Sequence, residues 1–126
     1  MNAFVEHTNI TVANPQATAA WMAEVFGWHV RWSGDAIHGG HSVHVGSDTS
    51  YVALYSPQQA LSEAPNSYGI KGGLNHVGVV VEDLDAAESV VKKHGFSTYS
   101  HADYEPGRRF YFEDENGIEF ELVQYD

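Results

Sequence analysis

Two short segments of this chain, residues 6–12 (EHTNITV) and 75–81 (NHVGVVV), are nearly alike. Each begins with a histidine near the start of a strand-like run, and each is followed by a polar turn and an alanine-rich amphipathic stretch. The two histidines, His7 and His76, lie 69 positions apart in a chain of 126 residues. A period this long that occurs only twice predicts two fused supersecondary units rather than a solenoid, which needs at least three repeats.

Turn and capping residues divide each copy into the same order of elements. A helix is predicted over 15–26, capped by Asn14 and ended by Gly27, and a second over 84–94, capped by Asp83 and ended by Gly95. Strands are predicted at 4–12, 28–33, 41–46 and 50–56, then at 74–81, 96–100, 108–113 and 118–124. The expected fold is α+β, with two tandem βαβββ modules that form curved mixed sheets. The modules, 4–56 and 74–125, are joined by the linker 57–73 within a single domain of residues 1–126.

The charge balance and the apolar content restrict the possible partners. Six Lys and Arg against seventeen Asp and Glu give a net charge of −11, which disfavours nucleic acid and anionic membranes as partners. No apolar run approaches the roughly 20 residues of a membrane span, and no secretory signal is evident at the N-terminus. The chain has no cysteine and eight histidines, so imidazole and carboxylate groups would have to hold any metal ion. We expect a cytoplasmic protein that acts on a small molecule.

The alternation of side chains along strands groups the candidate ligands. Val77, Val79 and Val81 suit the face that packs under the second helix, which leaves His76 on the opposite face. The same reasoning places His7 opposite the first helix and Glu121 opposite Phe120. His7, His76 and Glu121 are therefore all expected on the faces that the helices do not cover.

The paired histidine strands, the two helix-stop glycines and the closing segment 112–122 (FEDENGIEFEL) together resemble the vicinal oxygen chelate superfamily. This group is also called the glyoxalase/bleomycin resistance/dioxygenase superfamily, and the resemblance covers nearly all of the chain. The closing segment is similar to the family's Phe-x-Asp-Pro-x-Gly-x-x-x-Glu-Leu signature, with Glu115 where proline is usual. The resemblance implies a glyoxalase/bleomycin resistance/dihydroxybiphenyl dioxygenase-like fold.

The resemblance also implies a metal site. In such proteins the ligands come from the first strand of each copy and the last strand of one copy, which here are His7, His76 and Glu121. Two imidazoles and one carboxylate leave open positions on a divalent ion such as Fe, Mn, Zn or Ni, so that a substrate can chelate the metal through two adjacent oxygens. The expected function is a small metal-dependent lyase or extradiol-type dioxygenase. The alternative is a metal-free binding protein of the bleomycin-resistance type that sequesters an aromatic or cationic compound.

The resemblance also implies further site residues. Tyr111 lies on the same strand face as Glu121 and is the candidate catalytic residue, its alternative being a residue that merely lines the cavity. Asn9 and Tyr51 are expected to contact substrate. Arg109 would clamp a substrate carboxylate or, alternatively, pair with Glu113 or Glu119.

Several observations narrow the possible activities. Ala53 occupies the first-copy position that corresponds to Glu121. In the family, glyoxalase I and methylmalonyl-CoA epimerase typically use four protein ligands, one of them from this strand, so Ala53 counts against both activities. The segment 101–109 has neither lysine nor serine, which counts against the phosphonate loop of fosfomycin transferases. His41 or His44 could supply the third-strand histidine of extradiol enzymes, but we favour a surface location for both and for His38. Relatives of this length often pair as homodimers, and we expect one here.

Overall fold

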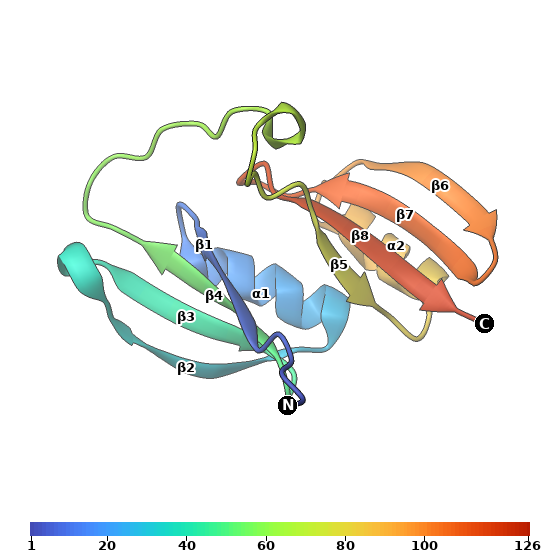
Figure 1. The fold of residues 1–126 in the computed structure, drawn as a ribbon, viewed down its shortest axis with the longest axis horizontal. Coiled ribbons are helices and arrows are strands. Elements are labelled where there is room, and N and C mark those ends of the chain that lie inside the picture. Colours follow the sequence, from blue (N-terminus) through green and yellow to red (C-terminus); the bar gives the residue numbers. More distant parts are fainter. The chain divides into compact units, whose positions relative to one another are not determined.

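The computed structural model describes all residues, 1–126, and divides them into two compact units, 1–61 and 62–126 (Figure 1). Each unit has one helix and a four-stranded mixed sheet. The first contains β1 (His7–Thr11), α1 (Pro15–Phe26), β2 (His29–Asp35), the 3₁₀ helix η1 (Ile37–Gly39), β3 (His41–Gly46) and β4 (Tyr51–Ser56). The second contains the 3₁₀ helix η2 (Ser67–Gly69), β5 (Val77–Val80), α2 (Leu84–Lys93), β6 (Thr98–Tyr104), β7 (Gly107–Glu113) and β8 (Glu119–Tyr125).

The two sheets have the same topology, which confirms the predicted tandem βαβββ fold. Their strand orders are β1-β4-β3-β2 and β5-β8-β7-β6. In each, the first strand pairs in parallel with the last, and the other neighbours are antiparallel. The last strand of each module therefore lies beside the first, which brings the candidate ligand positions of one module onto neighbouring strands.

Both helices begin after the predicted capping residues, and α1 ends at Gly27 as predicted, whereas α2 ends at Lys93, one residue earlier than predicted, with His94 as its C-cap. The side chain of Asn14 accepts a hydrogen bond from the amide of Ala17 at 3.1 Å, and Asp83 accepts one from Ala86 at 3.0 Å. Gly27 adopts a left-handed conformation with φ +71°, and its amide bonds to the carbonyl of Ala23 at the end of α1. These caps satisfy backbone groups at the helix ends, and each helix packs on the sheet of its own unit.

Each core lies between a helix and one face of its sheet. Val43, Val45 and Leu54 of the first sheet are at most 2% exposed, as is Met22 of α1. In the second unit Phe110, Phe112, Phe120 and Leu122 are fully buried, as their parity in the strands predicts. The opposite faces of both sheets carry the polar and aromatic side chains that make up the candidate site.

None of the helices is long and apolar enough to cross a membrane.

Some strand limits differ from the predicted ones. β1 and β5 begin later than predicted, so that His76 immediately precedes β5 instead of lying inside it. β6 instead extends to Tyr104, because Tyr104 pairs with Gly107 across a two-residue turn at Glu105-Pro106. Residues 101–107, which lie between the two predicted strands, are therefore mostly paired, and only Glu105 and Pro106 form the tip of a hairpin.

A buried aspartate shapes the turn before β8. One carboxylate oxygen of Asp114 accepts hydrogen bonds from the amides of Asn116 and Ile118, at 2.9 and 3.0 Å, and the other accepts one from the Asn116 side chain. Gly117 has φ +78°, a conformation that favours glycine. Burial raises the pKa of Asp114 despite these bonds. The turn sets the start of β8 and hence the positions of its two glutamates.

Candidate functional site

The face of the second sheet opposite α2 carries a cluster of polar side chains from three strands. Tyr111 of β7 pairs in register with Glu121 of β8, and Tyr99 of β6 pairs with Tyr111. On the other side of β8, Glu121 pairs with Gly78 of β5. A methyl group at Gly78 would lie 3.7 Å from Glu121 Oε1, so glycine leaves the space beside this carboxylate open.

The two oxygens of Glu121 have different surroundings. Oε2 accepts a hydrogen bond from the Tyr111 hydroxyl at 2.7 Å and another from Arg109 at 3.2 Å. Oε1 lies 3.7 Å from His76 Nε2. One oxygen is thus fixed by two donors, while the other faces an imidazole nitrogen across a gap too long for a hydrogen bond.

His76 is also supported from its other ring nitrogen. Its Nδ1 lies 3.4 Å from the Tyr68 hydroxyl and 4.0 Å from Glu119 Oε1. Its ring meets that of Tyr111 edge-on, with centroids 5.6 Å apart. These contacts leave Nε2 as the ring nitrogen that faces Glu121, and a metal-binding histidine commonly has this arrangement, with its second nitrogen held by a carboxylate or hydroxyl group.

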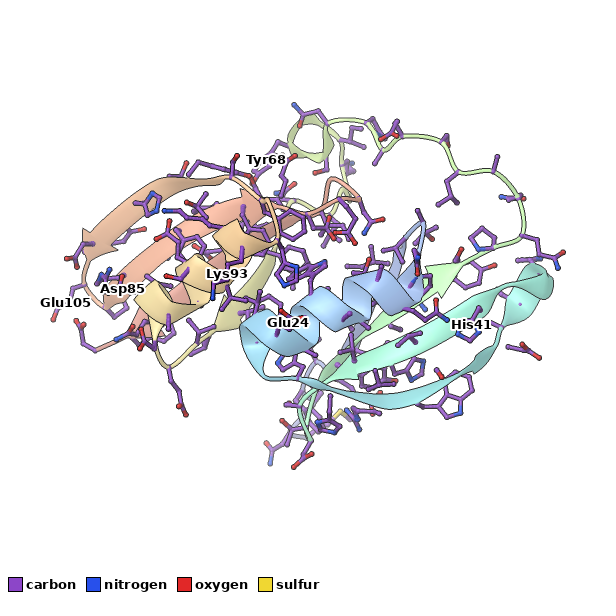
Figure 2. The ribbon with its side chains drawn as sticks, turned by 180° about the vertical axis from the view of Figure 1, so that it is seen from behind. Glu24, His41, Tyr68, Asp85, Lys93 and Glu105 are labelled. Atoms are coloured by element: carbon purple, nitrogen blue, oxygen red, sulfur yellow. The ribbon has the colours of Figure 1, made fainter.

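The sequence did not identify the residues behind His76. Tyr68, labelled in Figure 2, comes from η2 in the segment that was predicted to be only a linker. Its hydroxyl donates a short hydrogen bond to Glu119, and Tyr99 donates another at 2.6 Å. The position of Glu119, two residues before Glu121 on the same strand face, was a signal that could have found it. Nothing in the sequence places Tyr68 near β8.

The tyrosines of this cluster act as hydrogen-bond donors. The hydrogen bond to Glu121, together with burial, raises the pKa of Tyr111 to about 12. Burial and the bond to Glu119 raise the pKa of Tyr99, and the bond to Glu119 raises the pKa of Tyr68. All three phenols therefore keep their protons at neutral pH, and Tyr111 holds Glu121 instead of acting as a phenolate.

Arg109 has a partner that the sequence analysis did not consider. Its guanidinium pairs with Glu121 instead of Glu113 or Glu119. The Cζ atom of the same guanidinium lies 4.7 Å from the centroid of the Tyr104 ring. Its Nε is buried and has no hydrogen-bond partner. The Nε–H donor of Arg109 is therefore buried without an acceptor beside the carboxylate that Arg109 holds.

The corresponding face of the first sheet is aromatic. His7 stacks on Tyr51, and Tyr51 stacks on His44, with centroids 4.8 and 4.7 Å apart. Trp32 continues this row, 5.0 Å from His44. We call these four side chains, from β1, β4, β3 and β2, the aromatic row. His7 Nδ1 lies 2.9 Å from Glu6 Oε1, so His7 resembles His76 in having a carboxylate at Nδ1.

Strand register shows how the two faces correspond. Ala53 pairs with Asn9 as Glu121 pairs with Gly78, so Ala53 is the structural counterpart of Glu121. His44 pairs with Ala53 as Tyr111 pairs with Glu121. The first unit therefore has alanine and histidine where the second has the carboxylate and its tyrosine. Asn9 is exposed on β1, between His7 and Thr11.

The histidines around β3 have different environments. His44 lies in the aromatic row instead of on the open surface. A β-bulge between Val30 and Trp32 of β2 brings Trp32 opposite His44, and this neighbour could not be predicted from sequence alone. His41, labelled in Figure 2, shares the face of Val43 and Val45, which α1 covers, so it lies on the wrong face to join the row. His38 is exposed in η1.

Neither unit alone brings together three His, Asp or Glu side chains in a group that could hold a metal ion. The second unit supplies two facing donors, His76 and Glu121, and His7 belongs to the first unit.

Comparisons with known proteins agree with this architecture. The family model of the Glyoxalase/Bleomycin resistance protein/Dioxygenase superfamily matches residues 5–122. No curated protein sequence matches the chain significantly. Among solved structures, a glyoxylase/bleomycin resistance protein/dioxygenase domain from Frankia sp. EAN1pec superposes with a TM-score of 0.83 at 19% identity, covering 100% of both chains.

Two further structures show the range of proteins that share this fold. The fosfomycin resistance protein FosX from Listeria monocytogenes, complexed with Mn(II) and sulfate, has a TM-score of 0.73 at 15% identity over 100% of this chain and 95% of its own. TnmS3, an antibiotic-binding protein from Streptomyces sp. CB03234, has a TM-score of 0.70 at 16% identity over 99% and 98%. At such low identity these similarities establish the fold only. The family match over residues 5–122 shows that the chain belongs to the glyoxalase/bleomycin resistance protein/dioxygenase superfamily.

Proposed function

We propose that the chain is a small metal-dependent protein of this superfamily, in which His7, His76 and Glu121 hold a divalent ion. Its substrate would be a small molecule that chelates the ion through two adjacent oxygens. The observation that carries the proposal is the pair of facing donors in the second unit, with His76 Nε2 and Glu121 Oε1 only 3.7 Å apart.

The donor set suits such an ion. A carboxylate oxygen and an imidazole nitrogen are ligands for Mn, Fe, Zn and Ni, and both side chains are mostly buried, with 14% of Glu121 and 34% of His76 exposed. No lysine or arginine blocks the gap on the Oε1 side, because Arg109 bonds to Oε2. When bound, a divalent ion would polarise the substrate oxygens that it holds.

The residues around these donors would position them. Tyr111 and Arg109 hold the Oε2 oxygen of Glu121, which limits the rotation of the carboxylate and keeps Oε1 directed toward His76. Tyr68 and Glu119 support the imidazole from behind. Asn9 and Tyr51 remain candidates for contact with substrate.

FosX, with its Mn(II) complex, is a precedent on this fold for the metal-dependent reading. TnmS3, an antibiotic-binding protein, is a precedent on this fold for the binding of a small compound. The alternative is a metal-free protein that sequesters such a compound, and the aromatic row of the first unit favours that second candidate. Uptake of metal separates the two candidates.

Calorimetric titration with Mn(II) tests the proposal. Protein purified without a histidine tag and stripped with a chelator should bind one equivalent per chain, at micromolar or tighter affinity. Zn(II) should compete for the same site, because both ions accept nitrogen and carboxylate ligands. A stripped protein that takes up neither ion would contradict the metal-dependent reading and favour the binding protein.

We also propose that the active form is a homodimer in which His7 of one chain and the His76–Glu121 pair of the other can complete one site. Each sheet has a face that its own helix does not cover, and pairing such faces would close the site. Mixed dimers of His7→Ala and Glu121→Ala chains should then recover one intact site each. A monomer by light scattering at micromolar concentration would contradict the dimer.

A further inference from the structure

The aromatic row ends at an indole ring that is held in place but remains open to solvent. Trp32 lies on β2, at the edge of the first sheet, and is 49% exposed. Its six-membered ring lies over the backbone of Gly34, since a Cβ atom built on Gly34 would meet Trp32 Cζ2 at 2.7 Å. One side of the indole is therefore supported by the strand and by His44, while the other is available for stacking.

A positive charge lies beside this ring. The β-bulge between Val30 and Trp32 turns two consecutive side chains, Arg31 and Trp32, toward the same face of the sheet. The guanidinium carbon of Arg31 lies 4.7 Å from the centroid of the Tyr51 ring. Arg31 takes part in none of the ion pairs and side-chain hydrogen bonds of the structure, so its five N–H groups remain available.

Glu6 and Arg31 attract each other at a distance, but no carboxylate forms an ion pair with Arg31. Glu6 is the nearby carboxylate, and its Oε1 already contacts His7 Nδ1 at 2.9 Å and accepts from the Tyr51 hydroxyl at 3.4 Å. Burial, followed by the charges of His7 and Arg31, lowers the pKa of His44, so that His44 is neutral at pH 7. Arg31 thus stacks on Tyr51 but keeps its N–H donors free of side-chain acceptors, next to an exposed aromatic surface.

We infer that the first unit binds a planar aromatic compound that carries an anionic oxygen group, such as an aromatic carboxylate or phenolate. The ring would stack on Trp32, and the anionic group would receive hydrogen bonds from Arg31, which binds carboxylates in a fork-like geometry. The inference goes beyond the proposed metal site, since it uses only residues of the first unit and needs no metal ion.

The structure and the sequence favour ligands of opposite charge. The net charge of −11, together with Trp28, Trp32, Tyr51 and Tyr55, favours a cationic compound when the sequence is considered alone. In the structure Trp28 instead packs on Phe26, and the Tyr55 hydroxyl bonds to the carbonyl of Ile37, so neither belongs to the row. The charges of remote carboxylates are screened over about 8 Å at physiological ionic strength. The adjacent guanidinium of Arg31 therefore determines which ligand charge is favoured.

Two probes of the same shape and opposite charge test the inference. We expect 2-naphthoate to bind the metal-stripped protein saturably, at about one equivalent per chain, and at least fivefold more tightly than 2-naphthylmethylammonium. The titration is followed by the chemical shifts of the three indole N–H groups, with chelator present throughout. The Trp32 resonance should shift most, because the ring would stack on that indole.

Three variants locate the site. Trp32→Ala should weaken 2-naphthoate binding about tenfold, the worth of one stacked ring pair. Arg31→Gln should reduce the preference for the anionic probe to about onefold, and Gly34→Ala should weaken binding by displacing the indole without removing it. Trp28→Phe is the matched control, which removes an indole outside the row and should leave the affinity unchanged.

The inference is overturned if the cationic probe binds as tightly as 2-naphthoate, if neither probe saturates, or if Trp32→Ala binds like the wild type. Because metal is absent from these titrations, failure of the metal proposal would leave a positive result intact. Conversely, a metal-binding protein that ignores both probes would refute this inference alone.

Discussion

Replacing Glu121 with alanine should weaken Mn(II) binding by at least a hundredfold and leave the fold intact. Glu121 contributes the carboxylate of the proposed site, and loss of a supporting residue alone typically costs ten- to a hundredfold in metal affinity. The side chain is 14% exposed and bonds to Tyr111 and Arg109, so the variant would also release these two donors. Calorimetry gives the affinity, and circular dichroism checks the fold.

Glu113→Ala is the matched control for this experiment. Glu113 is an exposed carboxylate on the neighbouring strand β7, paired in register with Glu119, and it has no hydrogen bond or ion pair with any other side chain. We expect its removal to change the affinity less than twofold. Equal losses in the two variants would show that the metal responds to the general negative charge of the protein, and an unchanged Glu121→Ala affinity would remove this residue from the site.

Replacing Phe112 with alanine should lower the free energy of unfolding by about 3–5 kcal/mol, the usual cost of deleting a buried aromatic ring. Phe112 is 0% exposed, and its ring stacks on Phe120 and Phe96, with centroids 5.3 and 5.8 Å apart. The core of the second unit is small and depends on this stacking. In the variant, strands β5–β8 should therefore lose amide-exchange protection before the strands of the first unit.

Denaturant unfolding measures the change, and Phe4→Ala serves as the control. Phe4 is 77% exposed ahead of β1, and its truncation should change stability by less than 0.5 kcal/mol. A loss below about 1 kcal/mol for Phe112→Ala would contradict the described packing of the second core. Equal loss of amide protection in both units would show that they unfold together, as a single domain.

The fold was predictable from sequence because local signals agreed with the repeat. Asn14 and Gly27 set the ends of α1, and the alternation around Phe110 and Phe112 gave the buried face of β7. The same alternation put Glu121 and Tyr111 on one face, where the structure joins them by a 2.7 Å hydrogen bond. Such inferences need only the period of a strand or helix, which the sequence shows directly.

The remaining features depended on contacts that local patterns do not encode. Tyr68 reaches Glu119 from a segment 51 positions earlier, and no periodicity relates the two. Trp32 could not be assigned to a face until the β-bulge between Val30 and Trp32 was known, since one extra residue reverses the expected orientation of the residues that follow it on β2. The pairing of Arg109 with Glu121 depends on the side-chain conformations of two residues on neighbouring strands, which alternation along a strand does not determine.

The nitrogen ligands of a bound metal test the central claim most directly. Electron spin-echo modulation of the Mn(II)-loaded protein counts the imidazole nitrogens that are bonded to the ion. We predict two in the wild type and one in each of the His7→Ala and His76→Ala variants, measured at metal concentrations that keep the weakened sites occupied. Modulation from no imidazole, or from two in both variants, would contradict a site built from His7, His76 and Glu121.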